Sequence, residues 1–311
     1  MLNNKLLVFK GFRAFKSSIF MDSIFKNKIC GLVTLYNPPG NYLLNISTFS
    51  GYLDKLFLVD NTPAGKSVNH ASLLQQFPNA VILSTGKNLG IAKALNLGIE
   101  AALKDNASWL LTMDQDSYFD ADQAEKYFRS CTTVNKDKVA ILSPLHEKVV
   151  TDDALCVYER NDQVMTSGNL LNLSVIEKVG LFNEDLFIDS VDFDYCLRVI
   201  LFGYEVLQAT NCFMQHFVGE LYSGTFLFGM KKKTFYIHSP KRMYFIIRNA
   251  LYLSHQYKDK YPEFIKQHCK YIREDLFRLL KYSHNRVEYI GYVIKALNDY
   301  RRGIFGNPID I

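Results

Sequence analysis

From Cys30 onward, short continuous apolar runs alternate with segments whose apolar residues recur every three or four positions. Turn-forming residues bound the apolar runs, which we predict to be buried strands at 30–35, 55–60, 80–84 and 109–113. An amphipathic helix is predicted at 89–103, where helical steps connect Leu89, Ala92, Leu95, Ile99 and Leu103. Continuous apolar strands separated by helices indicate an α/β fold with a mostly parallel central sheet that helices cover on both faces.

Beyond residue 113 the pattern becomes mixed. It predicts strands at 139–143, 164–172 and 205–208, and helices at 121–131, 174–179 and 191–202. From about residue 240 the chain has the pattern of helical hairpins rich in Tyr, Phe, Lys and Arg. We therefore expect a basic N-terminal segment (1–29), an α/β domain (30–240) and a helical, basic and aromatic C-terminal region (241–311).

The composition is that of a globular protein. With 311 residues, 48% of them hydrophobic, the chain can bury a full core, and its 22% charged residues exclude the disordered, collagen and coiled-coil classes. No apolar run approaches the roughly 18 residues of a membrane span, and we expect no secretory signal. The six scattered cysteines are typical of reduced core residues, so we expect a cytoplasmic protein.

The charge is unevenly distributed along the chain. Residues 1–29 carry a net charge of +5, residues 30–240 carry −7 and residues 241–311 carry +7. An acidic middle between basic ends argues against a nucleic-acid partner and favours a metal-using catalytic domain whose flanks face an anionic surface. Because the basic flanks are rich in aromatic residues, we expect peripheral contact with a membrane. Helix packing with a solvated basic face, or a homodimer interface, is the alternative.

Polar residues stand where three of the four predicted strands end and where the predicted helix begins. They are found at 34–37, 60–61, 86–90 and 114–116. Each segment alone is typical of a turn, but the coincidence of four at one sheet edge indicates a ligand site. Asp114 and Asp116 directly follow a buried strand and offer oxygen ligands to a hard divalent cation. The pairs Asp120/Asp122 and Asp192/Asp194 have the same spacing without that placement.

Other phosphate and hydrolase chemistries lack their motifs. The sequence contains no G-x-x-x-x-G-K-[ST], no G-x-G-x-x-G opening a helix, no H-E-x-x-H and no G-x-S-x-G. These absences argue against a P-loop, a dinucleotide-binding site, a zinc protease and a nucleophilic serine.

Seven segments in order carry a resemblance to a known family: VTLYNP (33–38), LVDN (58–61), NLGIAKALNLGI (88–99), LLTMDQDS (110–117), SGNL (167–170), LFNEDLFIDSVDFDYCLR (181–198) and HFVGE (216–220). Together they resemble the family-2 glycosyltransferases, and the variant FID-x-VD with a later Tyr-x-x-x-Arg-Asn (244–249) is most similar to bacterial rhamnosyltransferases. The resemblance runs from about residue 30 to 249. It implies a GT-A fold, a nucleotide-diphosphate sugar donor, Mg²⁺ or Mn²⁺, and inversion at the anomeric carbon.

The resemblance also implies roles for acidic residues. Asp116, with Asp114, is expected to bind the metal that bridges the donor diphosphate, and His216 to complete the metal or phosphate site. A satisfied, partly buried histidine is the alternative for His216. Asp192 is the candidate general base that deprotonates the acceptor hydroxyl, and Asp189 is a candidate for binding acceptor hydroxyls. Helix capping is the alternative for Asp189.

The remaining matched residues are expected around the donor. Asp60 matches the residue that contacts the nucleobase or ribose, and Thr34 and Tyr36 would line the base pocket. Residues expected to face the phosphates or the donor sugar are Asn88, Gly90, Asn96, Gly168 and Asn169. Gly90 is also explained by close approach of a helix to the sheet.

Arg248 is expected to clamp the diphosphate, with a basic residue on a helix face as the alternative.

The resemblance implies an inverting enzyme that moves L-rhamnose from dTDP-L-rhamnose to a hydroxyl of a lipid-linked bacterial surface polysaccharide, and we expect it to work at the inner face of the cell membrane. A UDP-hexose or UDP-galactofuranose donor is the first alternative. A sugar-1-phosphate nucleotidyltransferase would need a glycine- and basic-rich loop after the first strand, which VTLYNPPG lacks. A noncatalytic glycan- or membrane-binding scaffold is the alternative outside the enzyme class.

Overall fold

A computed structural model describes residues 27–65, 68–131, 133–149, 153–216, 221–226 and 231–309, so nearly all of the predicted N-terminal segment lies outside the described residues. Within this part of the chain, the central sheet has the strand order β3-β2-β1-β4-β7-β5-β8-β6. Its strands are β1 (Ile29–Leu35), β2 (Lys55–Asp60), β3 (Ala80–Ser84), β4 (Trp109–Asp114), β5 (Val139–Leu145), β6 (Tyr158–Arg160), β7 (Asn169–Asn172) and β8 (Glu205–Phe213).

The first half of the sheet is parallel, as the apolar runs predict. Strands β1, β2, β3 and β4 pair in parallel, whereas β7 runs antiparallel between β4 and β5, and β6 runs antiparallel to β8. Strand β7 is shorter than the predicted 164–172. The strand begins only after Gly168, whose φ of +87° is rarely adopted by residues that have a side chain.

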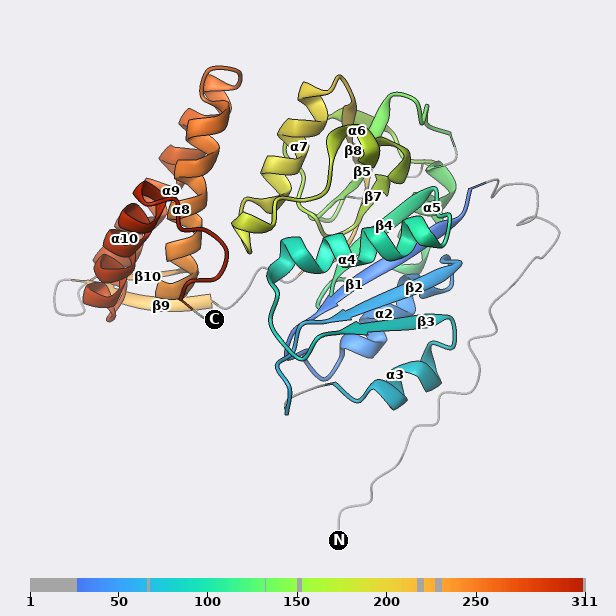
Figure 1. Cartoon of the computed structure of the whole chain (residues 1–311), viewed down its shortest axis with the longest axis horizontal. Coiled ribbons are helices and arrows are strands. Elements are labelled where there is room, and N and C mark those ends of the chain that lie inside the picture. Colours follow the sequence, from blue (N-terminus) through green and yellow to red (C-terminus); the bar gives the residue numbers. More distant parts are fainter. Residues whose placement is uncertain are drawn as a thin grey trace, which may run out of the picture.

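Helices cover both faces of this sheet (Figure 1), and their bounds are α2 (Tyr42–Ser50), α3 (His70–Gln76), α4 (Gly90–Lys104), α5 (Ala121–Ser130), α6 (Ile176–Val179) and α7 (Val191–Leu201). One core lies between the sheet and α4 and α7, and a second lies between the sheet and α2 and α5. Consecutive residues of β1, Leu32 and Val33, point to opposite faces and enter the first and second core respectively. This two-sided burial explains why the strands are apolar throughout.

The C-terminal region forms its own hydrophobic core. It consists of the antiparallel pair β9 (Leu221–Phe226) and β10 (Lys231–Tyr236) and the helices α8 (Pro240–Tyr257), α9 (Pro262–Tyr282) and α10 (Arg286–Arg301). Figure 1 shows the three helices side by side at one end of the molecule, beside α7. Helix α8 begins sharply because the Ser239 side chain accepts a hydrogen bond from the backbone of Arg242 and Pro240 occupies the first turn.

The helical C-terminal region is confirmed, whereas the β9–β10 pair was not predicted because the sequence KKKTFY does not alternate apolar and polar residues. Among the described residues, no helix combines the length and the apolar character needed to cross a bilayer.

Candidate active site

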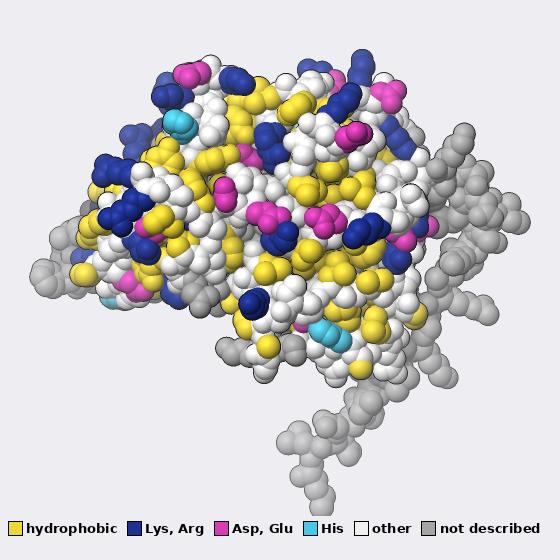
Figure 2. All heavy atoms as spheres, viewed as in Figure 1, with side chains coloured by type: hydrophobic (Ala, Val, Ile, Leu, Met, Phe, Trp, Pro, Cys, Tyr) yellow, Lys and Arg dark blue, Asp and Glu magenta, His cyan; other side chains and the backbone are white. Residues whose placement is uncertain are grey.

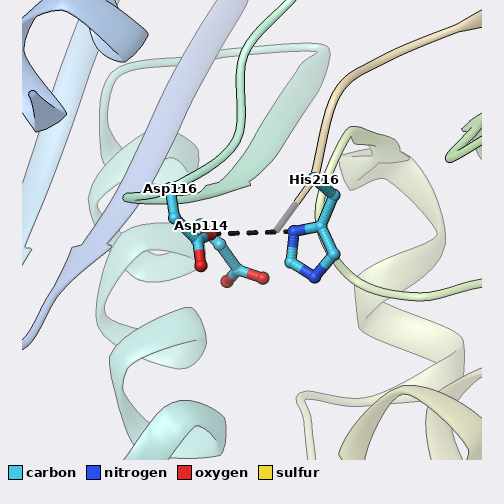
Figure 3. A group of neighbouring side chains, drawn as sticks. All are labelled: Asp114, Asp116 and His216. Atoms are coloured by element: carbon cyan, nitrogen blue, oxygen red, sulfur yellow. Dashed lines mark ion pairs between the residues drawn. The ribbon is translucent and has the colours of Figure 1, made fainter. Parts of the chain in front are cut away.

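Two aspartates and a histidine meet at the carboxyl edge of the parallel strands (Figure 3). Asp114 is the last residue of β4, Asp116 follows it in the turn, and His216 comes shortly after the end of β8. One ligand atom from each lies within 4.8 Å of the other two, and Nδ1 of His216 is 3.6 Å from Oδ1 of Asp116. The two strands that carry them lie on either side of β7 and β5, so only the folded sheet brings them together.

Two serines tie this group to the sheet. The Oγ of Ser117 is hydrogen-bonded to Nδ1 of His216 at 2.8 Å, and the Oγ of Ser167 donates to the Oγ of Ser117 at 2.9 Å. The Oγ of Ser167 also accepts a hydrogen bond from the backbone N–H of Asp114. Ser117 and Ser167 are both buried. Partners of this kind orient the side chains of a metal site.

The residues present fit a divalent cation. Oδ1 of Asp116 is buried and has no hydrogen-bond partner among the described residues, although a buried carboxylate oxygen normally has one. Burial raises the pKa of Asp114, and the neighbouring charge of Asp116 raises it further. A cation with oxygen and nitrogen ligands would supply the missing partner and the opposing charge. Asp114, Asp116 and His216 are therefore the residues that would hold Mg²⁺ or Mn²⁺.

A second acidic group consists of Asp189, on the segment that leads into α7, and Asp192, in the first turn of that helix. Phe187, Asp189 and Ser190 all have φ near +60°, an uncommon conformation for residues other than glycine. Such conformations cost free energy and persist where surrounding contacts fix them, often at functional sites. Asn249 on α8 supplies those contacts, because its side-chain amide donates to the carbonyls of Leu186, Ile188 and Asp189.

Asp192 stands in the first turn of α7 and has the electrostatics of a general base. Burial raises its pKa to about 6, and the nearby carboxylates of Asp189 and Asp114 contribute to the rise. Its Oδ1 accepts one hydrogen bond, from the backbone N–H of Phe193 at 2.9 Å. A base with a pKa near neutrality suits proton abstraction from a hydroxyl.

Arg242 is the functional candidate that the sequence analysis missed. Its guanidinium holds the Asp189 carboxylate, with Nη2 at 3.0 Å from Oδ1 and Nε at 3.2 Å from both oxygens. Asp189 raises the pKa of Arg242 most, and the charges of Asp114 and Asp192 raise it further. The Ser239-Pro240 helix start was the available signal, since it places Arg242 in the first turn of α8.

Arg248, predicted to clamp the diphosphate, is instead a buried structural residue. Its side chain is fully buried and donates to the backbone carbonyls of Asp185, Leu186 and Gly306. The guanidinium also lies over the ring of Phe305, 5.4 Å from its centroid. A side chain engaged in this way cannot reach a ligand, so the clamp assignment is wrong. Arg248 secures the backbone that leads to Asp189.

We expect Arg248→Met and Arg242→Met to separate these roles. Loss of the Arg248 hydrogen bonds leaves buried carbonyls unpaired and should lower the free energy of unfolding by about 3 kcal/mol. Arg242→Met removes a half-exposed ion pair and should change stability by less than about 1 kcal/mol. Donor affinity should fall about tenfold for Arg242→Met and stay near normal in folded Arg248→Met. Urea unfolding and calorimetric titration with dTDP measure both effects, and the reverse pattern would restore the clamp.

The beginning of α4 does not present free amides to a phosphate. The Gly90 N–H donates to Oδ1 of Asn88, and the carbonyl of Phe187 accepts from the next N–H, that of Ile91, at 2.7 Å. A Cβ on Gly90 would lie 2.6 Å from that carbonyl, so the glycine permits close approach of α4 to the segment before α7, not to the sheet as the alternative interpretation proposed. Asn96 is buried and hydrogen-bonded to the backbone of Phe182 in both directions. These residues position the segment that carries the second acidic group, which corrects their assignment to the phosphates.

At the other end of the edge, the predicted base pocket is only partly formed by the predicted residues. Tyr36 is exposed, and its backbone exchanges two hydrogen bonds with the side chain of Gln115, while Thr34 is buried in β1. Asp60 is buried, and its oxygens are engaged by the N–H of Thr62 and by Nε2 of His70 at 2.7 Å. A nucleobase that binds Asp60 would have to replace His70, so the Asp60 contact stays a prediction.

Gly168 lies in the buried turn before β7, next to Ser167, whose Oγ is hydrogen-bonded to Asp114, and Asn169 is the first residue of β7. The backbone of Gly168 is hydrogen-bonded to Thr112 and Tyr127, and a Cβ there would lie 2.3 Å from the sulfur of Met214. Asn169 is buried, and its Oδ1 has no hydrogen-bond partner among the described residues. Their placement below the donor sugar stays a prediction.

Solved structures share this fold. The structure of S. aureus TarS 1-349 in complex with UDP-GlcNAc matches 89% of this chain and 81% of its own, with 14% identity and a TM-score of 0.58. The mannosyltransferase PcManGT of Pyrobaculum calidifontis, in complex with GDP-Man and Mn²⁺, matches 90% of this chain and 84% of its own, with 11% identity and a TM-score of 0.54. The fold is that of the GT-A glycosyltransferases.

Sequence comparison then narrows the class. Residues 42–152 match the family model for glycosyl transferase family 2. The dTDP-rhamnosyl transferase RfbF of Shigella flexneri is 29% identical over 250 residues, which cover 72% of this chain and 79% of that protein. The chain is therefore similar to the family-2 glycosyltransferases and, among them, to a rhamnosyltransferase, as its motifs predicted.

Proposed function

We propose that this enzyme transfers L-rhamnose from dTDP-L-rhamnose to a hydroxyl of a glycan acceptor, with inversion at the anomeric carbon. The observation that carries the proposal is the cluster at the carboxyl edge of the sheet, where Asp114, Asp116 and His216 fit a divalent cation. A second group, Asp189, Asp192 and Arg242, lies at the starts of α7 and α8, where Arg242 is paired with Asp189. The similarity to a dTDP-rhamnosyl transferase supports the choice of donor.

Each group has a distinct task in the transfer. Asp114, Asp116 and His216 hold the cation, Mg²⁺ or Mn²⁺, which when bound neutralises the charge that develops on the departing diphosphate. Arg242 places a second positive charge beside the diphosphate. Asp192 takes the proton of the acceptor hydroxyl while the oxygen of that hydroxyl forms a bond to the anomeric carbon. The bond from that carbon to the diphosphate oxygen breaks on the opposite face, so the bonding electrons leave with dTDP.

Asp189 positions Arg242 in the state described here. The two side chains form a bidentate pair at the start of α8, and the side-chain amide of Asn249 donates to the backbone carbonyl of Asp189. When the pair loosens, Asp189 becomes available to accept hydrogen bonds from acceptor hydroxyls, as the resemblance implies. The pair therefore connects the donor side of the site to the acceptor side.

A donor panel tests the proposal. The purified protein is incubated with Mn²⁺ and with dTDP-L-rhamnose, UDP-glucose, UDP-galactose or UDP-galactofuranose, and release of the nucleoside diphosphate is followed with water as acceptor. We expect hydrolysis of dTDP-L-rhamnose to exceed that of each UDP-sugar. Preference for a UDP-sugar would select the alternative donor, and no hydrolysis of any donor would select the noncatalytic scaffold.

We further propose that the enzyme acts at a membrane surface on a lipid-linked acceptor. Apolar residues at helical spacing are exposed on α10, where Val287, Ile290 and Ile294 have exposed fractions of 84%, 47% and 53%. Lys and Arg side chains gather over the same C-terminal region in Figure 2. An apolar stripe beside basic residues is suited to the headgroup region of an anionic bilayer.

Replacing the stripe should weaken membrane binding. We expect Val287→Glu with Ile294→Glu to lower the partition of the protein onto vesicles of phosphatidylglycerol and phosphatidylcholine by about tenfold or more, because apolar burial is lost and negative charge is added. Leu44→Glu, at an exposed residue of α2, is the matched control. Sedimentation with vesicles measures partition. Unchanged partition, together with a shift from dimer to monomer in solution, would assign the stripe to a homodimer interface instead.

A further inference from the structure

A cavity of about 470 Å³ lies in the C-terminal region. It is bounded by β9, the residues that lead into α8, and the turn between α9 and α10, and its lining residues include Tyr222, His238, Ser239, His284, Asn285 and Tyr289. This volume falls within the roughly 300–1,000 Å³ of small-molecule sites. None of the predicted donor or metal residues lines it.

The cavity adjoins the acceptor side of the site. Ser239 lines the cavity and caps the helix turn that contains Arg242, which in turn holds Asp189. Burial lowers the pKa of His238, and the charges of Arg242 and Asp189 act on that pKa in opposite directions. A molecule beside Ser239 in the cavity is therefore about one helical turn from Arg242 and its partner Asp189.

The lining has the chemistry of a carbohydrate site. Tyrosine and histidine rings offer faces for the C–H surfaces of a pyranose, and the serine and asparagine side chains offer hydrogen bonds to its hydroxyls. Oη of Tyr222 is buried and has no hydrogen-bond partner among the described residues. A sugar hydroxyl would supply that partner. The hydroxyl of Tyr289 donates to the carbonyl of His238 and fixes one wall against another.

We propose that this cavity is the acceptor subsite, which binds a pyranose unit of the acceptor glycan and directs one of its hydroxyls toward Asp192. The inference rests on the proposed function, because a sugar acceptor presupposes transfer. Binding here would place the acceptor between the C-terminal region and the catalytic edge, which gives the helices after residue 240 a part in acceptor choice.

Three variants test the subsite. His284→Ala removes an exposed ring, Tyr222→Phe removes only the unpartnered hydroxyl, and Asn285→Trp fills the cavity. His255→Ala, an exposed histidine of α8 that does not line the cavity, is the matched control. The probes are a panel of p-nitrophenyl pyranosides, whose binding to the protein with Mn²⁺ and dTDP is measured by saturation-transfer NMR, and whose use as acceptors is measured with dTDP-L-rhamnose.

We expect at least one pyranoside to bind the wild-type chain. His284→Ala and Tyr222→Phe should raise its dissociation constant about tenfold, and Asn285→Trp should abolish binding. Donor hydrolysis with water should stay normal in all three variants and in the control. Equal binding to wild type and Asn285→Trp, or no binding of any pyranoside to wild type, would overturn the subsite. Loss of donor hydrolysis in the wild-type chain would instead contradict the proposed function.

Discussion

Asp192→Asn should lower the turnover of sugar transfer by about 10²–10⁴-fold, the range that a general base contributes. The amide keeps the shape of the side chain and its place at the start of α7 but cannot take the acceptor proton. Because Asp192 is not one of the residues that would hold the metal ion, metal-dependent binding of dTDP should stay within about threefold of normal. Turnover with dTDP-L-rhamnose and calorimetric titration with dTDP measure the two effects.

Asp185→Asn is the matched control, since it makes the same change at an exposed residue nearby. Turnover of the wild-type enzyme should also rise with pH through the pKa of Asp192, which is about 6, because a base works only when it is deprotonated. The Asp192→Asn variant should lose this rise. If the variant retains wild-type turnover, Asp192 is not the base.

Asp116→Ala should abolish metal-dependent donor binding and lower turnover by about 10³-fold or more, since a metal ion contributes several kcal/mol of charge stabilisation. The change removes an oxygen that is buried without a hydrogen-bond partner, so it should cost little stability. Electron paramagnetic resonance titration of Mn²⁺ measures the loss of the ion. Wild type should bind Mn²⁺ more tightly in the presence of dTDP, whereas the variant should not.

Asp122→Asn is the control for this change, because Asp120 and Asp122 have the same spacing in the sequence as Asp114 and Asp116. Asp122 lies in the first turn of α5 and bonds to Gln123, outside the cluster. Normal Mn²⁺ binding by the Asp116→Ala variant would contradict this account, because it would show that other residues hold the ion. The cluster would then have no role in donor binding.

The sheet and the position of Asp114 and Asp116 at its edge were predictable because both depend on signals that are local in the sequence. The apolar runs of β1, β2, β3 and β4 predict buried parallel strands, and the carboxyl ends of such strands meet at one edge. That rule alone places Asp114 and Asp116 at a ligand site. The histidine came from the family resemblance, since β8 is separated from β4 by two other strands of the sheet.

The errors concern polar residues that are buried for structural reasons. Arg248 and Asn96 bond to backbone carbonyls and amides of the segments that lead to Asp189, and sequence motifs do not distinguish such a role from ligand binding. Arg242 was missed for the opposite reason. Its partnership with Asp189 arises only when α8 packs beside the segment that leads into α7, a contact between residues 53 positions apart.

A crystal structure of the enzyme with dTDP and Mn²⁺ tests the central claim most directly. The account predicts an ion bound by Asp116 and His216 and in contact with the diphosphate, with the carboxylate of Asp192 facing the position of the donor sugar. Nucleotide bound at any other place, or an Asp192 carboxylate turned away from the diphosphate, would contradict it.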